Sequence, residues 1–188
     1  MKKAENPKKK KGGKLTLVII VIALAVMAFA LFKIAQIYKD YQESEQTFEK
    51  LEETYVVNPD GSSVTEADWK DDTRIQFDVL KKENPDIMVW LRFDNFDEVH
   101  INYPVLYSGD DFKYLRSDIY GNYHIAGCIF LEGLNNPDFF DYHSIIYGHN
   151  MRNTTMFGDL KRYKNDEGFY EKNQFFNVYT ADKVYRYQ

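Results

Sequence analysis

The chain has 188 residues and a formal net charge of −5, and 44% of its residues are hydrophobic. Seven lysines and one glutamate give residues 1–14 a charge of +6, so residues 15–188 carry −11. This acidic body argues against nucleic acid as a partner, because phosphate binding needs lysine and arginine on the folded surface. The single cysteine, Cys128, excludes an intrachain disulfide. The length allows one domain of ordinary size plus accessory segments.

The basic tail of residues 1–14 precedes an apolar run, residues 15–32, whose one polar member is Thr16. Such a run is just long enough to span a membrane, and residues 34–38 could extend it. We therefore predict a transmembrane helix over residues 15–38, in contact with lipid. Lysines before the run and acidic residues after it place the N-terminus in the cytoplasm and the C-terminal domain outside the cell.

The same run leaves open a cleavable signal peptide, because Ala28-Phe29-Ala30 resembles a cleavage site. The run is longer than the apolar region of most signal peptides, which favours an uncleaved anchor. Both interpretations export residues 40–188. The function is therefore expected outside the membrane.

A predicted stalk or linker, residues 39–63, joins the membrane segment to the domain. Residues 34–55 lack glycine and proline and place apolar side chains at helical spacing, which predicts a helix that packs one face on the domain. A solvated spacer is the alternative. Residues 58–63 read as a turn, so the domain is expected over residues 64–188.

Strands and short helices alternate along this domain, which predicts a mainly β fold with short helices. A helix over residues 71–83 should end at Asn84-Pro85. Pro104 suggests that its strand lies at a sheet edge or contains a bulge. The predicted strands cover residues 87–93, 100–107, 126–132 and the run from Ser144, followed by a hairpin of 175–180 and 183–187. Further short helices are expected at residues 110–120, 156–163 and 167–173.

The run from Ser144 carries the most informative pattern. An apolar, β-branched stretch ends on Gly148 and then presents His149 and Asn150. A buried strand that delivers a histidine at its end is one way to hold a general acid or base at the rim of a cleft. Any strand can also end in this way, so the pattern alone leaves both interpretations open.

Metal and glycosidase chemistry have little support. His143 and His149 are six residues apart, a spacing that suits neither one helix face nor a short chelating turn, and no cysteine pair accompanies them. We therefore predict no metal site. Asp138 and Asp141 could form a carboxylate pair, but acidic residues occur in every loop of this chain.

Nucleophilic catalysis needs a serine or cysteine beside a histidine. Cys128 lies in an apolar strand, which predicts inert packing in the core. Ser144 is five residues from His149, and this odd spacing on a strand turns it to the opposite face. His100 and His124 are expected to be surface residues. Spacing alone therefore gives His149 no visible nucleophile.

Two blocks of sequence resemble the catalytic-histidine segment of class B sortases, membrane-bound enzymes of Gram-positive bacteria. They are Tyr147-Gly148-His149-Asn150-Met151 and Met156-Phe157-Gly158-Asp159-Leu160. Further matches lie at residues 101–105, 114–115, 127–131 and 135–139. The resemblance covers roughly residues 70–188.

The resemblance implies a sortase β-barrel, preceded by N-terminal helices, and cysteine transpeptidation without a cofactor. In this family a thiolate attacks a carbonyl within a short sorting signal, often of the Asn-Pro-x-Thr type, on a secreted protein. An amine of peptidoglycan or of a pilin then resolves the acyl-enzyme. His149 would donate and accept the proton. Leu115 and Asn150 would contact the sorting-signal peptide.

The chain also departs from the family pattern. The family places its nucleophilic cysteine, and an arginine further on, in strands after the histidine. No cysteine follows His149, and Arg186 comes too early for that arginine. We therefore expect an incomplete barrel that lacks its C-terminal strands, in a fragment that is itself inactive. The alternative is a non-catalytic, membrane-tethered β domain that binds peptides.

Overall fold

A computed structural model describes residues 13–58, 60–62, 64–65, 69, 74–139 and 141–188. The chain divides into two units, Met1–Lys39 and Asp40–Gln188. The predicted basic tail, apart from its last two residues, lies outside the described residues, as do parts of the predicted turn at 58–63 and of the predicted helix at 71–83.

The described part of the first unit is helical and belongs to α1 (Gly13–Tyr55). No glycine or proline interrupts the sequence between Lys14 and Tyr55, so nothing in it breaks the helix. Large apolar side chains between Leu15 and Phe32 are exposed. By length and composition, α1 is the one helix among the described residues that could cross a membrane.

The part of α1 in the second unit packs one face on the domain. Ser44, Phe48 and Leu51 are buried, at the spacing of one helix face. The ring of Phe48 meets that of Tyr103 edge-on, with 5.1 Å between centroids. The predicted packing helix is therefore confirmed for this stretch, and a solvated spacer is wrong here.

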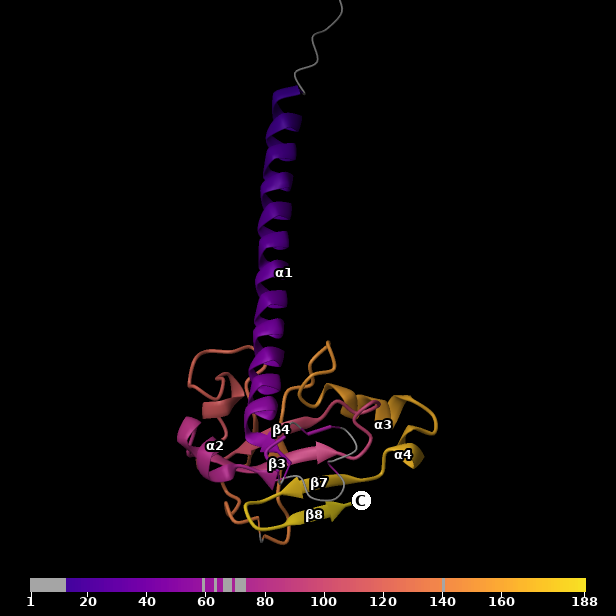
Figure 1. The fold of residues 1–188 in the computed structure, drawn as a ribbon. Helices are drawn as coiled ribbons and strands as arrows, with labels where there is room; N and C mark the ends of the chain where they lie inside the picture. Colours follow the sequence, from indigo (N-terminus) through magenta and orange to yellow (C-terminus); the bar gives the residue numbers. More distant parts are fainter. Residues whose placement is uncertain (1–12, 59, 63, 66–68, 70–73, 140) are drawn as a thin grey trace, which may run out of the picture. The chain divides into compact units, whose positions relative to one another are not determined.

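The second unit is built on a six-stranded sheet with the order β6-β5-β4-β3-β7-β8 (Figure 1). Neighbouring strands are antiparallel except for β4 and β5, which run parallel. The strands are β3 (Ile87–Phe93), β4 (Asn102–Leu106), β5 (Ile129–Leu131), β6 (Ile146–Tyr147), β7 (Phe176–Tyr179) and β8 (Val184–Tyr187). A separate two-stranded sheet pairs β1 (Val56–Val57) with β2 (Arg74–Ile75).

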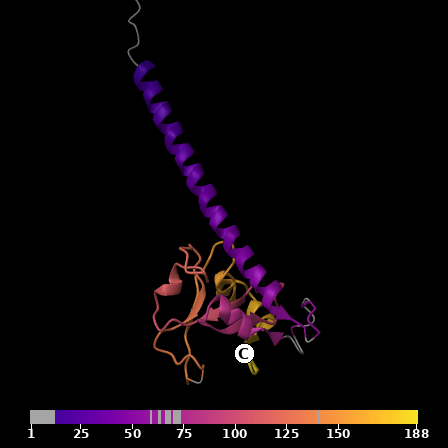
Figure 2. The same cartoon turned by 60° about the vertical axis from the view of Figure 1, so that its left-hand side comes forward.

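The predicted fold class, mainly β with short helices, is confirmed, but the sheet is open and forms no closed barrel. A barrel needs every strand to pair on both sides. Within the described chain, β6 and β8 each pair with one strand, so the ladder ends at both. Figure 2 shows the long segments between β4 and β6, in pink to orange, to one side of the domain.

The strand predictions are confirmed in place, although several strands are shorter than expected. Pro104 does not mark a sheet edge, because β4 lies between β3 and β5. Pairing with β5 begins at Val105, one residue after Pro104, so no β5 partner requires the missing N–H. Pro104 does not mark a bulge in β4 either, since it pairs regularly with Trp90; the β3–β4 pair has a register shift, but it lies in β3 between Ile87 and Val89.

The helix predictions are only partly confirmed. The helix α2 (Phe77–Glu83) ends before Asn84-Pro85 as expected. The predicted helix at 110–120 is wrong, since one short 3-10 turn, η2 (Lys113–Leu115), forms there. Asp110 caps that turn, and its carboxylate accepts the N–H groups of Phe112 and Lys113. The later helices are η3 (Gly158–Lys161), α3 (Arg162–Asn165) and α4 (Phe169–Lys172).

Candidate functional site

The histidine of the Tyr-Gly-His-Asn-Met block follows β6, a two-residue strand at the edge of the sheet. The predicted buried strand is only half-buried: Ile146 is partly covered, and Tyr147 is 38% exposed. Gly148 permits a close approach, because a Cβ atom there would lie 2.7 Å from Cδ2 of Phe157. The glycine therefore lets the chain fold back on itself directly before His149.

The ring of His149 is held by one hydrogen bond. Its Nε2 atom lies 2.8 Å from the carbonyl oxygen of Leu115. A carbonyl oxygen can only accept, so Nε2 carries the proton and Nδ1 of the neutral ring is unprotonated. Nδ1 makes no hydrogen bond to any residue that the structure describes. This partly buried imidazole therefore has one open basic nitrogen that can accept a proton.

The structure brings Leu115 and His149 together but gives Asn150 a different position. Leu115 ends the η2 turn, and the residue is 40% exposed. Asn150 is exposed, and its backbone pairs with Met156 in an isolated bridge. Its side chain makes no hydrogen bond within the described parts of the chain. Leu115 therefore borders the His149 site, whereas Asn150 faces solvent.

Residues 149–159, which we name the histidine loop, fold into a compact turn. The N–H of Phe157 donates to the carbonyl oxygen of His149 at 3.0 Å. Gly158 lies against Met151, where a Cβ atom would come 2.5 Å from the carbonyl oxygen. Thr154 and Met156 adopt φ angles of 68° and 54°, which non-glycine residues seldom do.

Cys128 has the features of a packing residue. Its side chain is 1% exposed, and its thiol donates to the carbonyl oxygen of Ser117 at 3.3 Å. Burial raises the pKa of the Cys128 thiol far above its ordinary value, and the nearby Asp118 carboxylate adds to this effect. A thiol that stays neutral is a poor nucleophile. Cys128 therefore does not provide His149 with an activated thiol.

The metal, carboxylate and serine candidates from the sequence form no catalytic group in the described residues. No group of three or more His, Cys, Asp or Glu residues that could hold a metal occurs in the described chain. The carboxylate of Asp141 accepts N–H groups from Asn135 and Asn136, so it shapes its own loop. Ser144 is partly buried two residues before β6, and no hydrogen bond between described residues joins it to His149.

The two histidines expected at the surface both have specific partners. His124 is partly buried; its Nε2 lies 2.7 Å from the carbonyl oxygen of Asp40, and its Nδ1 accepts the N–H of Ala126. His100 pairs with the buried carboxylate of Asp159 at 2.8 Å. These contacts join residues 84 and 59 positions apart, so local sequence patterns could not reveal them.

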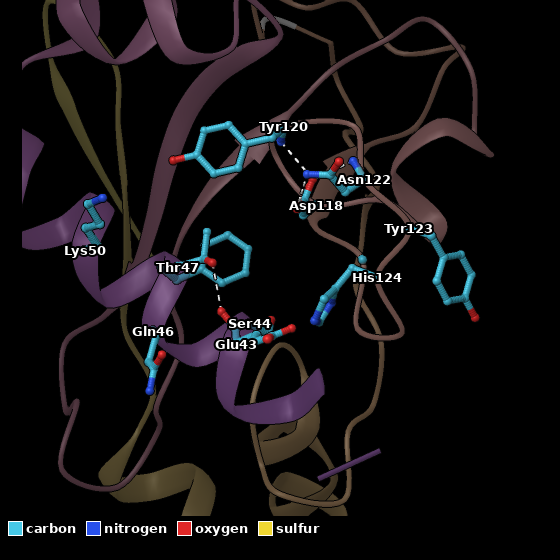
Figure 3. A pocket seen from close by; sticks show the side chains of 12 residues that line it. Glu43, Ser44, Gln46, Thr47, Lys50, Asp118, Tyr120, Asn122, Tyr123 and His124 are labelled. Atoms are coloured by element: carbon cyan, nitrogen blue, oxygen red, sulfur yellow. Dashed lines mark hydrogen bonds between the residues drawn. The ribbon is translucent and has the colours of Figure 1, made fainter. Parts of the chain in front are cut away.

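A pocket of about 490 Å³ lies near this region but does not contain the candidate residues (Figure 3). It is lined by residues of α1 and of the segment between Asp118 and Gly127. Gly127 forms part of its wall and packs so closely on η2 that a Cβ atom would lie 2.7 Å from the carbonyl oxygen of Leu115. Gly127 and His149 therefore both lie against the carbonyl group of Leu115.

Comparisons with known proteins agree on one family, although no protein-family model matches the chain. Sortase B of Staphylococcus aureus (strain NCTC 8325 / PS 47) is 29% identical over 160 residues, which cover 85% of this chain and 61% of that protein. Sortase B of Listeria monocytogenes serovar 1/2a is 31% identical over 152 residues, covering 81% and 57%. The chain thus spans about three fifths of the length of these curated relatives.

Solved structures give the same result. Sortase B from Bacillus anthracis, in complex with AAEK1, superposes with a TM-score of 0.65 at 28% identity, covering 79% of this chain and 66% of that one. Sortase B from Clostridium perfringens gives a TM-score of 0.54 at 32% identity, covering 58% and 57%. A Staphylococcus aureus sortase B–substrate complex gives 0.54 at 31% identity, covering 59% and 50%. By sequence and by fold, the chain belongs to the class B sortase family.

Proposed function

We propose that the chain carries the acid/base part of a class B sortase transpeptidation site, with His149 as the residue that moves the proton. One observation carries this proposal: Nε2 of His149 is committed to the Leu115 carbonyl, so Nδ1 is left free beside an exposed leucine. An imidazole ring can both give and accept a proton, which suits a residue that acts in both steps of a transfer reaction.

The proposed reaction has two proton transfers. A thiolate attacks a peptide carbonyl in the sorting signal; protonated His149 gives its proton to the leaving amine as the C–N bond breaks. A primary amine from peptidoglycan or a pilin then attacks the thioester, and neutral His149 takes the proton from that amine as the sulfur leaves as a thiolate, which restores the starting thiolate and protonated His149. Leu115 and Asn150 would contact the peptide. Cys128 is not assigned the role of this thiol, since its side chain is buried.

The placement of the chain is part of the proposal. Residues 15–38 would span the membrane once, with the tail of residues 1–14 in the cytoplasm, the stalk of residues 39–63 outside, and residues 64–188 as the extracellular domain. Exposed apolar side chains along α1 and the lysines before it support this orientation. Protease treatment of intact cells tests it: the domain should be digested while an epitope fused before Lys2 stays protected.

The enzymatic role is tested in the native gene. Replacing His149 by alanine should lower wall anchoring of a reporter that carries an Asn-Pro-x-Thr signal by about 100-fold to 10,000-fold, as expected for loss of a general acid/base. His143→Ala is the matched control, because His143 is exposed and lies six residues earlier. Unchanged anchoring in the His149→Ala strain would contradict the proposal.

A non-catalytic peptide-binding domain is the second candidate, and the burial of Cys128 favours it. The two functions differ in what His149→Ala does. If the chain only binds peptide, the purified variant should still bind the Asn-Pro-x-Thr peptide, and no strain should anchor the reporter through this gene. Mass spectrometry after exposure to a vinyl-sulfone sorting peptide separates them further, since an adduct on Cys128 would contradict its packing role.

A further inference from the structure

A buried carboxylate closes the histidine loop at its C-terminal end. The side chain of Asp159 is 1% exposed. Its Oδ2 atom accepts two hydrogen bonds from one residue, His100: the backbone N–H donates at 2.9 Å and the ring Nδ1–H at 2.8 Å. Hydrogen bonds to an ionised acceptor are stronger than neutral ones, and a buried carboxylate needs them.

His100 is itself held in place. Its ring meets that of Phe96 edge-on, with 5.7 Å between centroids. His100 lies two residues before β4, an internal strand that pairs with both β3 and β5. The carboxylate of Asp159 is therefore attached directly before an internal strand of the sheet.

The histidine loop needs such an attachment. Thr154 and Met156 hold left-handed backbone conformations, which persist where surrounding contacts enforce them. Within the loop, the N–H of Phe157 reaches the His149 carbonyl and the N–H of Gly158 reaches the Thr155 carbonyl. Besides Asp159, a second tie to β4 is made by Met156, whose N–H donates to the Tyr103 hydroxyl at 3.2 Å.

We propose that Asp159 is a positioning residue for His149. Its carboxylate fastens the end of the histidine loop to His100, which fixes Phe157 and, through the Phe157 N–H, the backbone of His149. The ring of His149 then reaches the Leu115 carbonyl with Nε2, and Nδ1 remains the open nitrogen. That this positioning serves catalysis rests on the function proposed above. That Asp159 positions His149 does not depend on that function.

The test reads the tautomer of His149 in the full chain, solubilised in detergent micelles and labelled with ¹⁵N-histidine. The chain has four histidines, so their ring signals can be assigned by substitution. In the unchanged protein at pH 8, His149 should be almost entirely protonated at Nε2. In Asp159→Ala, the ratio of the Nε2–H to the Nδ1–H form should fall about fivefold, the change that accompanies loss of one net hydrogen bond.

Two further variants grade the effect. Asp159→Asn keeps an oxygen acceptor for the His100 N–H and should restore most of the tautomer ratio. His100→Ala removes the ring donor but keeps the backbone donor, so its ratio should lie between those of the unchanged protein and Asp159→Ala. If Asp159→Ala fails to fold, the tautomer ratios of these two variants show whether Asp159 positions His149.

Val178→Ala is the stability control, because Val178 is buried in β7 and lies outside the histidine loop. It should lower the unfolding temperature without moving the His149 signals. The proposal is overturned if Asp159→Ala leaves the tautomer ratio unchanged, or if Val178→Ala alters it equally. Neither readout requires peptide or a nucleophile, so the two proposals can fail separately. The positioning role fails if the tautomer ratio does not change, even where His149→Ala abolishes anchoring. The proposed function fails if His149→Ala leaves anchoring unchanged, even where the tautomer ratio falls as expected.

Discussion

The Nε2 atom of His149 donates to the carbonyl oxygen of Leu115 at 2.8 Å and so joins two residues 34 positions apart in the sequence. Leu115 provides an exposed apolar side chain, and His149 provides a basic ring nitrogen. Leu115 belongs to the η2 turn, and His149 follows the edge strand β6. Their contact therefore fixes the distance between the exposed leucine and the basic nitrogen of the histidine.

Gly148→Ala should destabilise the chain by about 1–3 kcal/mol, the usual cost of overpacking. The added Cβ would lie 2.7 Å from Cδ2 of Phe157 and force that ring to move. Phe157→Leu should relieve the clash, so the double variant should lose less stability than the sum of the two single variants. Thermal unfolding of the full chain in detergent measures all three. Strict additivity would contradict a direct contact between these positions.

Stability should decline in alkaline solution. Burial raises the pKa of Tyr103 to about 12 and that of the Cys128 thiol further still. A raised pKa means that the folded chain holds its proton more tightly than the unfolded chain, so the stabilisation is complete below the unfolded pKa and is lost as pH rises through the folded value. The decline should begin near pH 8.5, where an unfolded cysteine ionises, and steepen above about pH 10, where unfolded tyrosines do.

Cys128→Ala isolates the thiol's part of this pH dependence. The variant should show a flatter stability profile between about pH 8.5 and 10, where cysteine titrates before tyrosine. Above that range its profile should run parallel to that of the unchanged protein. Denaturant midpoints measured at several pH values provide the comparison. An unchanged profile in the variant would mean that Cys128 ionises as readily in the folded chain as in the unfolded one.

Ser44→Ala should leave stability unchanged or raise it by about 1 kcal/mol. Ser44 is 4% exposed, and its hydroxyl has no hydrogen-bond partner among the described residues. Removing a buried hydroxyl that lacks a partner removes its desolvation cost. Alanine also favours the helix, so Gln42→Ala, at an exposed position of α1, supplies the control for propensity alone. A clear loss of stability would show that the Ser44 hydroxyl is bound in solution.

Tyr103→Phe should cost about 1–3 kcal/mol, because it leaves the buried N–H of Met156 without its acceptor. Tyr107→Phe removes a hydroxyl that donates to the Gly133 carbonyl at a partly buried position, and its cost should be smaller. Unfolding in denaturant gives both values. Equal costs would indicate that the hydroxyl of Tyr103 does not support the histidine loop.

Much of the fold was predictable because its signals are local. The hairpin of β7 and β8 follows from alternating apolar residues on each side of a short turn, and α2 ends where Asn84-Pro85 requires it. The helix expected at residues 110–120 does not form, and the reason is also local. Asp110 and Asp118 each use their carboxylates to cap nearby N–H groups, which competes with a continuous helix.

The site was harder to predict, because its contacts are distant in sequence and partly made by backbone atoms. His149 was found through the block around it, but a carbonyl acceptor such as that of Leu115 leaves no mark on the sequence. His100 is at the surface as expected, but its partner Asp159 lies 59 positions away and was not predicted. A single histidine or aspartate gives no periodic signal, so such a pair becomes visible only in three dimensions.

The shortness of β6 has a consequence for how this region moves. Two residues that pair with one neighbour contribute little to the cooperative unfolding of the whole domain. The corner that bears His149 can therefore open in small, frequent excursions while β3 and β4 stay closed, and its amide hydrogens should exchange with solvent well before theirs.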